Sequence, residues 1–599
     1  MQKKMEYNGV TFYSYGAYKW TDLDVPDNLT EITFPYMESG FSSYYFCHCT
    51  KSFPHIQKLV IPAYVYLTMP NSLFPNARQV IYDGPKGHKP MTKPYHTHPN
   101  GKTLYNAFCL REDETADLSG ISQITDDAFS GCQTLKFTHT NLVKICDKFA
   151  FRGSVIEQLK AEKGSVIMAD TILVDIDHTS GSIIIPDKKK AITAIRRGLD
   201  FSTAHCLTIH RIQTLALLQP FLSENMTVRL ETDQCFTQDQ LQDLLIAAPL
   251  ELIGNPYYKT IDGVLYTADG RVLVKCPCTK HGVFQIPEGV ETIAHSACKN
   301  SNIEEVRFPD TMRHLSPKAF SGCKRLKKIE FGNGLLDIGI GENALVFSDC
   351  TALENIEVPS HVTTIGGGSF QDCQSLKQII FHEGLTHIFD RAFHNIMKKT
   401  MVSIDHLDLP STLQYIGPMN FEHVSTIQLH SDNIPYGLFR AITVDIFTED
   451  NYHRPDDFYI RVVMPQETLF VPRAITSDDL EKLEFHLSLP APWSSWKNQL
   501  FQFGINPEMK QVTALAACRE TGAKEQYDYL RKTGKNFIKR LVEQNDEQGI
   551  VDLTKLGVLT PSAAKEGYQL AKEHGLITAM AYLMDAVNKA GRKETSFSV

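Results

Sequence analysis

Cysteine and histidine gather at one point of this sequence in a pattern that could bind a metal ion. Cys276, Cys278 and His281 offer three soft ligands within a short stretch. A structural zinc site combines such a pair with a second pair of ligands elsewhere in the chain, and no second pair is apparent in the sequence. We therefore predict that this cluster marks the end of a β-hairpin and holds no metal.

Two other clusters lead to the same prediction. Cys47, His48 and Cys49 lie inside an aromatic stretch, and His96 and His98 lie in the proline-rich segment KPYHTHPNGK. A solvated turn accounts for the histidine pair, because proline, asparagine and glycine mark turns and loops. We expect neither cluster to be a metal site.

The sequence also lacks the short motifs of catalysis. The triplet Gly366–Gly368 is not followed by the GK[ST] of a phosphate-binding loop, and neither G-x-S-x-G nor H-E-x-x-H occurs. Paired carboxylates from distant segments cannot be recognised from spacing, so a catalytic site assembled from such segments stays open as an alternative. We predict a protein that is not an enzyme, with no catalytic residues, no metal and no cofactor.

Composition limits the class of partner. The chain of 599 residues is 42% hydrophobic and 22% charged, which is typical of several globular domains. Its net charge of −9 argues against a nucleic-acid partner, which would require a basic surface. No run of 18 apolar residues occurs, and the lysine pair near the N-terminus is not followed by an apolar segment. We therefore expect no membrane partner, no signal peptide and a cytoplasmic location.

The elements that could position functional residues repeat along the chain. Between residues 285 and 393 the sequence presents about four similar units, whose phenylalanines lie 27, 23 and 23 residues apart at Phe320, Phe347, Phe370 and Phe393. A period near 23 predicts a solenoid, in which each unit buries its apolar face against its neighbours. Such an array is suited to binding a partner along an extended surface.

Each unit is expected to form one coil. In KKIEF (residues 327–331), Ile329 and Phe331 alternate with Lys328 and Glu330, which is the periodicity of a strand with one buried face. A later step of one small residue and one phenylalanine, as in Ser369-Phe370, would stack successive rings inside the coils. Extra residues at 339–343 lengthen one coil, as a loop insertion would.

The pattern I-P-x-x-V-x-x-I-x-x-x-A-F-x-x-C-x-x-L-x-x-I-x-F resembles the BspA-like leucine-rich repeats. The match is strong over roughly 260–430, where the hairpin Ile261–Pro277 precedes the array. Upstream, Ile121–Leu135 is a nearly complete unit, while Phe53–Pro62 and Phe74–Pro85 are degenerate ones. The resemblance implies a right-handed solenoid with a strand-lined face and a role in binding protein or glycan.

After residue 475 the composition indicates helices. Thr476 can cap a first helix, Gln511–Gly534 predicts two short helices joined at Gly522, and Thr560–Gly591 repeats the theme with a reversal at Gly575. Phe537–Leu559 fits between them as a third copy. This region resembles ankyrin-type helical repeats.

We therefore predict an α/β repeat fold, a leucine-rich repeat solenoid followed by an all-α domain of helical hairpins. The first expected segments are degenerate repeats over 1–185 and an irregular insert over 186–255, with helices near 188–197 and 237–247. Regular repeats over 256–430 and a cap or linker over 431–475 follow, the latter with strands over 442–448 and 458–464. The ankyrin-like domain occupies 476–599.

Cysteine is expected as a core residue. Cys132, Cys323, Cys350 and Cys373 occupy one position of the repeat, three residues after a phenylalanine. Stacked coils do not by themselves provide disulfide geometry, and we found no export signal. We predict reduced, buried thiols.

The outward strand positions are the candidate binding site, because they align in columns on one face of a solenoid. The column flanked by the two apolar strand residues comprises Arg307, Glu330, Glu357, Ile380, Asp408 and Gln428. The neighbouring column comprises Glu305, Lys328, Asn355, Gln378, His406 and Thr426. An ordinary solvated face is the alternative.

Trp493 and Trp496 are a second candidate. They could form an interface hot spot, but we favour a role in docking the helical domain onto the solenoid. The preferred function is a non-enzymatic scaffold that binds a protein partner through the strand face and, as a further candidate surface, the helical tail. The alternative is a surface adhesin or glycan-binding protein.

Overall fold

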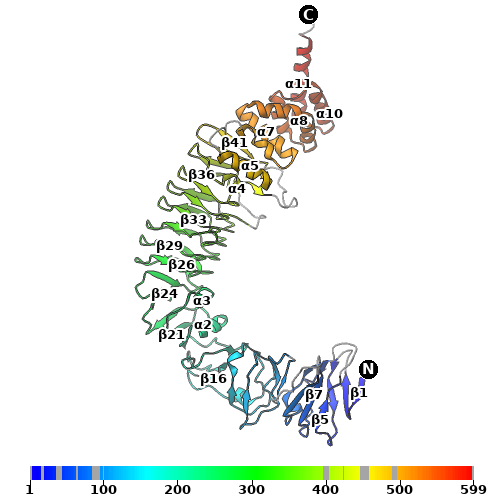
Figure 1. Ribbon diagram of the computed structural model, residues 1–599, viewed down its shortest axis with the longest axis vertical. Coiled ribbons are helices and arrows are strands. Elements are labelled where there is room, and N and C mark those ends of the chain that lie inside the picture. The colour runs from blue at the N-terminus through cyan, green and yellow to red at the C-terminus, as the bar shows by residue number, and fades with distance from the viewer. Residues whose placement is uncertain are drawn as a thin grey trace. The chain divides into compact units, whose positions relative to one another are not determined.

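The protein is described by a computed structural model that covers residues 3–14, 19–35, 43–46, 48–62, 65–83, 95–98, 100–395, 404–421, 424–445, 458–488 and 496–595. It forms two compact units, residues 1–268 and 269–599. Strands succeed one another as stacked coils in both units, and the helices of the second unit follow its coils (Figure 1). The unit boundary falls within the segment that we expected to form the regular repeats.

The first unit opens with an antiparallel sheet and continues as parallel ladders. The antiparallel strands are β1 (Lys3–Tyr7), β2 (Val10–Ser14) and β4 (Asp22–Asp24). The first parallel ladder joins β5 (Glu31–Thr33), β7 (Lys58–Pro62) and β9 (Gln79–Asp83). The second joins β3 (Lys19–Trp20), β6 (Ser43–Tyr45) and β8 (Tyr66–Thr68). Strands β7 and β9 therefore form inside the two segments that we described as degenerate repeats.

Further ladders complete this unit. They join β10 (His96–Thr97), β11 (Thr103–Asn106), β13 (Gln123–Ile124) and β15 (Ile145–Cys146); β12 (Thr115–Asp117) and β14 (Lys136–Thr138); and β16 (Val166–Ala169), β17 (Ile172–Ile176) and β19 (Ala194–Ile195). The hairpin β23 (Tyr258–Ile261) and β24 (Val264–Thr267) ends the unit.

The segment 186–255 continues the strand ladder, in contrast to the irregular insert that we expected. Its parallel sheet has the order β18 (Ser182–Ile184), β20 (Cys206–Ile209), β21 (Thr227–Glu231) and β22 (Leu250–Ile253). The helix predicted near 188–197 is wrong, because the segment holds turns and β19, in which buried Ala194 pairs with Ile172. Sheet pairing here outweighs the helical propensity of a lysine- and alanine-rich sequence.

Two helices do form in this segment. Helix α2 (Ile212–Leu218) was not predicted, and α3 (Gln238–Gln242) lies inside the predicted 237–247 stretch. Thr237 and Gln240 form a reciprocal capping box at the start of α3. The cap explains why the helix begins where it was expected.

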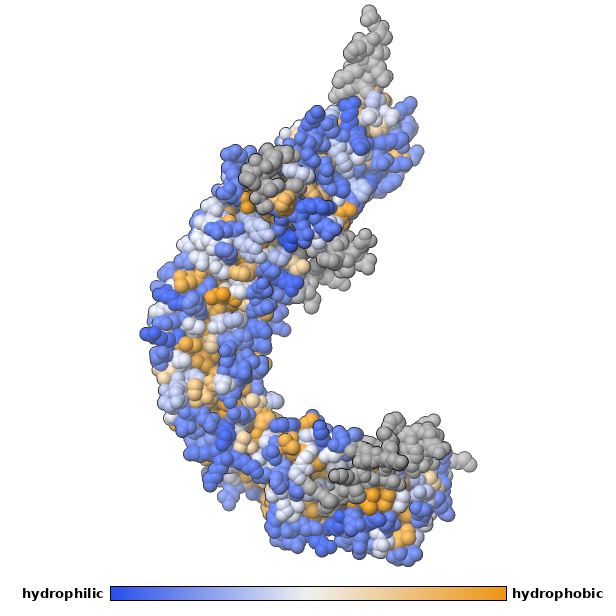
Figure 2. Space-filling view, in the orientation of Figure 1, coloured by the Kyte–Doolittle hydropathy of each residue, from blue (hydrophilic) through white to orange (hydrophobic). Residues whose placement is uncertain are grey.

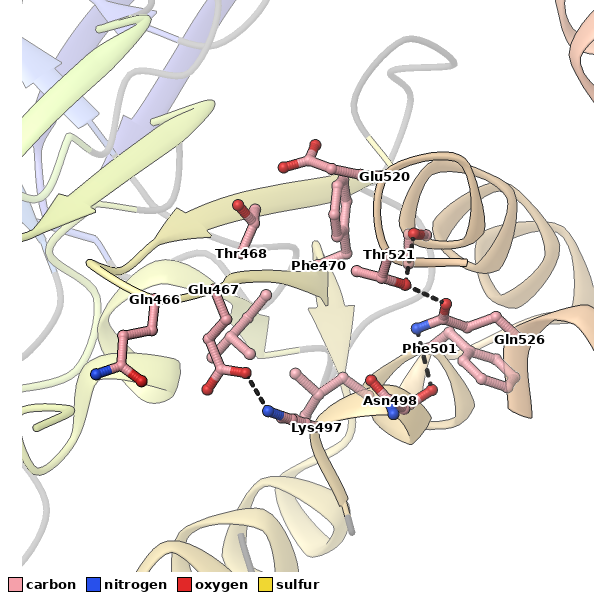
Figure 3. Close-up of a pocket in the computed structure, with 13 residues that line it drawn as sticks. Gln466, Glu467, Thr468, Phe470, Lys497, Asn498, Phe501, Glu520, Thr521 and Gln526 are labelled. Atoms are coloured by element: carbon pink, nitrogen blue, oxygen red, sulfur yellow. Dashed lines mark hydrogen bonds and ion pairs between the residues drawn. The ribbon is translucent and has the colours of Figure 1, made fainter. Parts of the chain in front are cut away.

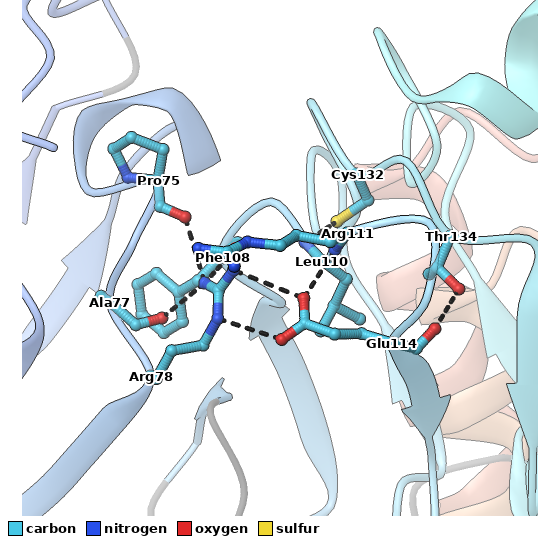
Figure 4. A network of polar contacts seen from close by, with 9 residues as sticks. All are labelled: Pro75, Ala77, Arg78, Phe108, Leu110, Arg111, Glu114, Cys132 and Thr134. Atoms are coloured by element: carbon cyan, nitrogen blue, oxygen red, sulfur yellow. Dashed lines mark hydrogen bonds and ion pairs between the residues drawn. The ribbon is translucent and has the colours of Figure 1, made fainter.

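Arg78 holds two successive parts of the first unit together (Figure 4). Its guanidinium donates from Nε to Glu114 Oε1 at 3.2 Å and from Nη1 to the carbonyl oxygen of Phe108 at 2.8 Å. Glu114 in turn accepts from the backbone N–H of Arg111. One charged pair therefore satisfies backbone groups on both sides of residues 84–94.

The second unit has one ladder of longer strands and one of shorter strands. The longer strands are β26 (His281–Gln285), β28 (Asn302–Arg307), β30 (Lys328–Glu330), β32 (Asn355–Val358), β34 (Gln378–Phe381), β36 (His406–Leu409), β38 (Thr426–Leu429) and β40 (Tyr459–Val463). The shorter ones are β25 (Val272–Lys275), β27 (Thr292–Ile293), β29 (His314–Leu315), β31 (Asp337–Ile338), β33 (Thr364–Ile365), β35 (His387–Ile388) and β37 (Tyr415–Ile416). Parallel pairing joins the longer strands in three groups, β26–β28–β30, β32–β34 and β36–β38–β40. It joins the shorter strands in two groups, β25–β27–β29 and β31–β33–β35–β37.

The predicted phenylalanine column forms the core of these coils. Phe320 and Phe347 stack with ring centroids 5.3 Å apart, Phe347 and Phe370 also at 5.3 Å, and Phe370 and Phe393 at 5.2 Å. The first three rings are almost fully buried, while Phe393 is half-buried. The repeat register derived from the sequence is thereby confirmed for this stretch.

The cysteine position is buried as expected. Cys132, Cys323, Cys350 and Cys373 are buried free thiols. Cys350 donates to the carbonyl oxygen of Phe320 at 3.4 Å, and Cys373 donates to that of Phe347 at 3.3 Å. Each thiol thus satisfies a backbone carbonyl of the preceding coil. Burial raises the pKa of Cys373 to about 12.

The end of the solenoid combines strands with one short helix. We expected a strand over 442–448, but α4 (Leu438–Ile442) precedes the short β39 (Val444–Asp445), and residues 446–448 lie outside the described residues. The strand expected over 458–464 is present as β40, which pairs with β38 and with β41 (Thr468–Pro472). Strand β42 (Ala474–Ile475) pairs with β39.

A helical region follows, as predicted. It comprises α5 (Ser477–Ser488), the 3-10 helix η6 (Lys497–Phe503), α7 (Pro507–Thr521), α8 (Lys524–Glu543), α9 (Glu547–Lys555), α10 (Pro561–Glu573) and α11 (Ile577–Thr595). The hydroxyl of Thr560 caps α10, and Gly522 ends α7 in the left-handed region with φ of 62°. None of the helices in the described part of the chain is both long and apolar enough to cross a membrane.

The third helical copy that we expected over Phe537–Leu559 is wrong in its boundary. Helix α8 runs without interruption through Gly534 to Glu543, so Phe537 belongs to α8. Glycine costs about 1 kcal/mol in a helix interior. Here Gly534 is buried, and a Cβ atom built on it would lie 3.2 Å from Leu559, so its small size permits close packing.

Candidate protein-binding face

In the second unit, backbone register aligns the members of the predicted outward column two by two. Arg307 pairs with Glu330, Glu357 pairs with Ile380, and Asp408 pairs with Gln428. Because side chains alternate along a strand, these residues lie between the inward residues of each coil. The neighbouring column forms in the same way, through the pairs Glu305–Lys328, Asn355–Gln378 and His406–Thr426.

At β28 and β30 the two columns form a compact network of ion pairs. Arg307 Nε lies 2.7 Å from Glu305 Oε1 and 3.1 Å from Glu330 Oε2, and Lys328 also pairs with Glu330. The hydrogen bond from Lys328 lowers the pKa of the Glu330 carboxyl group. The Glu330 carboxyl group is therefore ionised at neutral pH. Basic and acidic side chains contact one another across these two strands.

Further along the array, carboxylates are accompanied by histidine. Glu357 Oε1 lies 2.8 Å from His382 Nε2, and Asp408 Oδ1 lies 3.2 Å from His430 Nε2. Ile380 is 37% exposed between these two acidic positions. The surface here offers a partner two acceptor groups separated by an apolar contact.

Gln428 makes a hydrogen bond to the backbone of the next strand. Its Nε2 donates to the carbonyl oxygen of Val463 at 3.2 Å. Its amide therefore supports strand β40, which lies next to it. The geometry assigns Gln428 a structural contact at the end of the column.

The visible surface of the coils mixes hydrophilic groups with small hydrophobic clusters (Figure 2). Individual exposed ion pairs contribute about 0–1 kcal/mol to stability. A partner can therefore replace such contacts with its own charges at little cost. This arrangement suits recognition over several coils.

Of the two tryptophans proposed as a candidate site, Trp496 lies within the described residues. Trp493 lies outside the described residues. Trp496 is half-buried, and its ring lies 6.4 Å from that of Phe503 in η6. The helical region contacts the solenoid end through α7 and η6, which pack against β41. Trp496 therefore lies at the docked segment, and its own contribution to docking stays a prediction.

The residues suggestive of metal binding have other surroundings. Cys276 is buried and donates to the carbonyl oxygen of Pro277, and buried His96 has its pKa lowered to about 3 by desolvation. Cys47 lies outside the described residues. Within the part of the chain that the structure describes, no three histidine, cysteine or acidic side chains are grouped to hold a metal ion.

The glycine triplet has a packing explanation that spacing alone did not reveal. The loop insertion at residues 339–343 packs against it, and a Cβ atom on Gly367 would lie 2.0 Å from the carbonyl oxygen of Glu342. On Gly366 it would lie 2.6 Å from the Cβ atom of Ala344. Glycine is needed there because the inserted backbone approaches closely.

Two polar groupings were missed in the sequence. The side chain of Asp187 is fully buried. It accepts hydrogen bonds from the backbone N–H and Nδ1 of His210, at 2.8 and 2.9 Å, and from the backbone N–H of Arg211 at 3.0 Å. These three hydrogen bonds join two coils of the first unit. The other is a pocket between β41 and the helical region, lined by residues from several elements. No sequence spacing predicts it, because its walls come together only when the helices dock.

Comparison with known proteins identifies the coils. The profile of the BspA type leucine rich repeat region matches six copies, at residues 105–193, 276–345 and 340–451. The coils within these residues are BspA-type leucine-rich repeats. The matched BspA-type segments include Ile121–Leu135 and most of the array that the sequence had indicated. A search among curated proteins gives no match.

Solved structures of bacterial leucine-rich repeat proteins are similar to this chain. A leucine rich cell surface protein from Faecalibacterium prausnitzii is 18% identical, covering 65% of this chain and 92% of its own, with a TM-score of 0.23. The pneumococcal vaccine antigen PcpA is 14% identical, covering 72% and 94%, with a TM-score of 0.25. A leucine-rich repeat protein from Eubacterium ventriosum is 13% identical, covering 75% and 97%, with a TM-score of 0.26. At these scores the structures support no inference about binding.

Proposed function

We propose that the protein is a non-catalytic interaction scaffold that binds a protein partner through the long-strand face of its second unit. The observation that carries the proposal is the position of Arg307, Glu330, Glu357 and Asp408 at outward strand positions, where register pairs Arg307 with Glu330, Glu357 with Ile380 and Asp408 with Gln428. Leucine-rich repeat proteins are in general interaction or surface proteins, which supports this class of function. We also propose a cytoplasmic location, supported by the buried free thiols of the cysteine column.

Charge complementarity would set the choice of partner and the rate of association. One basic position followed by three acidic ones along the column favours one register of a partner and opposes others. Their attraction is screened over about 8 Å at physiological salt. We therefore expect binding to weaken as the salt concentration rises, with the largest effect on the association rate.

The test is the double variant Glu330→Lys/Glu357→Lys in a pull-down with the full-length protein. We expect the partner recovered with the wild-type protein to be lost, while thermal melting is unchanged. The matched control is Glu291→Lys/Glu342→Lys, which makes the same charge change at exposed or half-exposed positions outside the two columns. Equal loss in both variants would show a nonspecific charge effect, and full retention in the first would refute the proposed face.

A second candidate function is glycan binding, favoured by one specific feature. The rings of His387 and Tyr415 lie 6.1 Å apart, and those of Tyr415 and Tyr436 stack at 6.1 Å, with Tyr436 63% exposed. Exposed aromatic rings can pack against the apolar face of a sugar. The variant Tyr436→Ala should abolish binding on a glycan array in this case and leave protein capture by the strand face intact.

A further inference from the structure

Strand β41 lies at the end of its sheet. The sheet has the order β36-β38-β40-β41, so one edge of β41 pairs antiparallel with β40 and the other faces away from the sheet. An edge strand presents backbone N–H and C=O groups that can pair with another chain. Which residues present them follows from the hydrogen-bond phase of the hairpin.

That phase is fixed at both ends of the hairpin. The N–H of Met464 donates to the carbonyl oxygen of Glu467, and the N–H of Arg473 donates to that of Phe458. Hydrogen-bonded pairs alternate with non-hydrogen-bonded pairs along an antiparallel ladder. Thr468 and Phe470 therefore belong to the pairs that direct their backbone groups away from β40.

Those backbone groups remain available. In the described part of the chain, no backbone hydrogen bond joins Thr468 or Phe470 to a group on the far side of β41. Pro472, the next residue of this phase, has no N–H and ends the series of donors. The open edge thus offers two donors and two acceptors over three residues.

A hollow of about 400 Å³ lies against this part of β41 (Figure 3). Thr468 and Phe470 come from the strand, Lys497 and Phe501 from η6, and Gln526 from α8. Its volume lies toward the lower end of the range for ligand sites, 300–1,000 Å³. It is therefore large enough for a short segment of chain and too small for a folded element.

Charges in the walls are already paired. Lys497 forms an ion pair with Glu467, which Figure 3 shows at the side of the hollow. Glu520 pairs with Arg461 at 2.9 Å. With both carboxylates neutralised, the walls favour an occupant without net charge.

The remaining wall groups form a relay of hydrogen bonds. Thr521 Oγ1 donates to Gln526 Oε1 at 2.8 Å, and Gln526 Nε2 donates to the carbonyl oxygen of Asn498 at 3.3 Å. These amide and hydroxyl groups can also hydrogen-bond a peptide group. The apolar surfaces of Phe470 and Phe501 complete a lining suited to a small aliphatic side chain.

We propose that this pocket binds a short, uncharged, extended peptide segment of a partner, which adds as a strand to the free edge of β41. Three extended residues span the backbone groups of Thr468 and Phe470, since a strand rises about 3.4 Å per residue. Backbone hydrogen bonds provide the affinity, as in other cases of strand addition. The site is separate from the charged strand face and does not depend on it.

The probe is the blocked peptide Ac-Thr-Val-Thr-Val-Thr-NH₂ carrying a fluorescein label, with binding followed by anisotropy on the full-length protein. Thr468→Pro removes a donor that the hairpin itself does not use, whereas Thr468→Val keeps it. We expect Thr468→Pro to weaken binding about tenfold, the effect of about one hydrogen bond in a desolvated site. Thr468→Val should remain within about twofold of wild type.

Three further measurements keep the proposal falsifiable. Because backbone donors are required, an analogue N-methylated at each residue should not bind. Hydrogen exchange of residues 466–472 in the wild-type protein should slow when the blocked peptide is present, a readout that survives misfolding of Thr468→Pro. Binding should persist in Glu330→Lys/Glu357→Lys and at high salt, which separates this site from the proposed strand face.

Any one of four results would overturn the proposal. The peptide fails to bind, or its N-methylated analogue binds with equal affinity. Alternatively, a folded Thr468→Pro keeps its affinity for the peptide, or hydrogen exchange at residues 466–472 is unchanged by it.

Discussion

Removal of the Phe370 ring tests the central packing feature of the second unit. The ring is 1% exposed and stacks between Phe347 at 5.3 Å and Phe393 at 5.2 Å, with interplanar angles of 9° and 11°. Phe370→Ala therefore empties a buried site and breaks two aromatic contacts at once. Substitutions of this kind typically cost about 3–5 kcal/mol.

The size of the effect should depend on burial along the column. Phe393 is half-buried, so less apolar area returns to water in Phe393→Ala, and we expect about half the loss of Phe370→Ala. Tyr436 is 63% exposed, and Tyr436→Ala should change stability by no more than about 0.5 kcal/mol.

Hydrogen exchange is the suitable assay, because a long repeat protein need not unfold in one step. The free energy of opening would be measured for amides of residues 353–393 in each variant. A loss below about 1 kcal/mol in Phe370→Ala, or a loss no larger than that of Tyr436→Ala, would refute the assigned register and the stacking argument.

Three other predictions concern the thiol column, the polar network of the first unit and the glycine triplet. Burial raises the pKa of Cys373 to about 12 in the folded protein, so the stability linked to its protonation is present below the unfolded pKa and lost as pH rises toward 12. Melting curves at alkaline pH should show this loss. Iodoacetamide should label the thiol only after denaturation. A disulfide at this residue in a non-reducing digest would contradict the prediction. Arg78→Met should destabilise the first unit by about 1–3 kcal/mol, since it strips charged hydrogen bonds from backbone carbonyls, whereas Lys58→Met breaks one partly exposed pair and should cost under about 1 kcal/mol in the same urea titration. Gly367→Ala should cost about 1–3 kcal/mol by thermal melting, because its Cβ would collide with the carbonyl of Glu342, and unchanged melting would refute the close approach.

The sequence allowed the periodic part of the fold to be predicted because the same interaction recurs in each coil. Phe320, Phe347 and Phe370 repeat a packing environment, so their spacing alone gives the register. The outward columns follow from that register, since alternation along a strand fixes which side chains are exposed.

What could not be predicted depends on contacts between distant segments. Residues 188–197 have helical composition but pair as strand β19, because Ala194 meets Ile172 in a parallel ladder. Gly534 suggested a helix end, yet buried packing against Leu559 carries α8 through it. The pocket beside β41 has no sequence signal, as its walls come from a hairpin and helices that follow it in the chain.

The covering of β41 by later residues has a consequence for synthesis on the ribosome. Strand β41 ends at Pro472, and helix α7, which packs against it, is complete only at Thr521. At roughly 5–20 residues per second, translation of this interval takes about 2–10 s. During that time the surface of β41 that α7 later contacts is exposed beside the free edge, and both can associate with a neighbouring nascent chain. Pro472 has no backbone N–H, so it shortens the part of the edge strand that can hydrogen-bond another chain. The residue that bounds the peptide site therefore also limits co-translational aggregation.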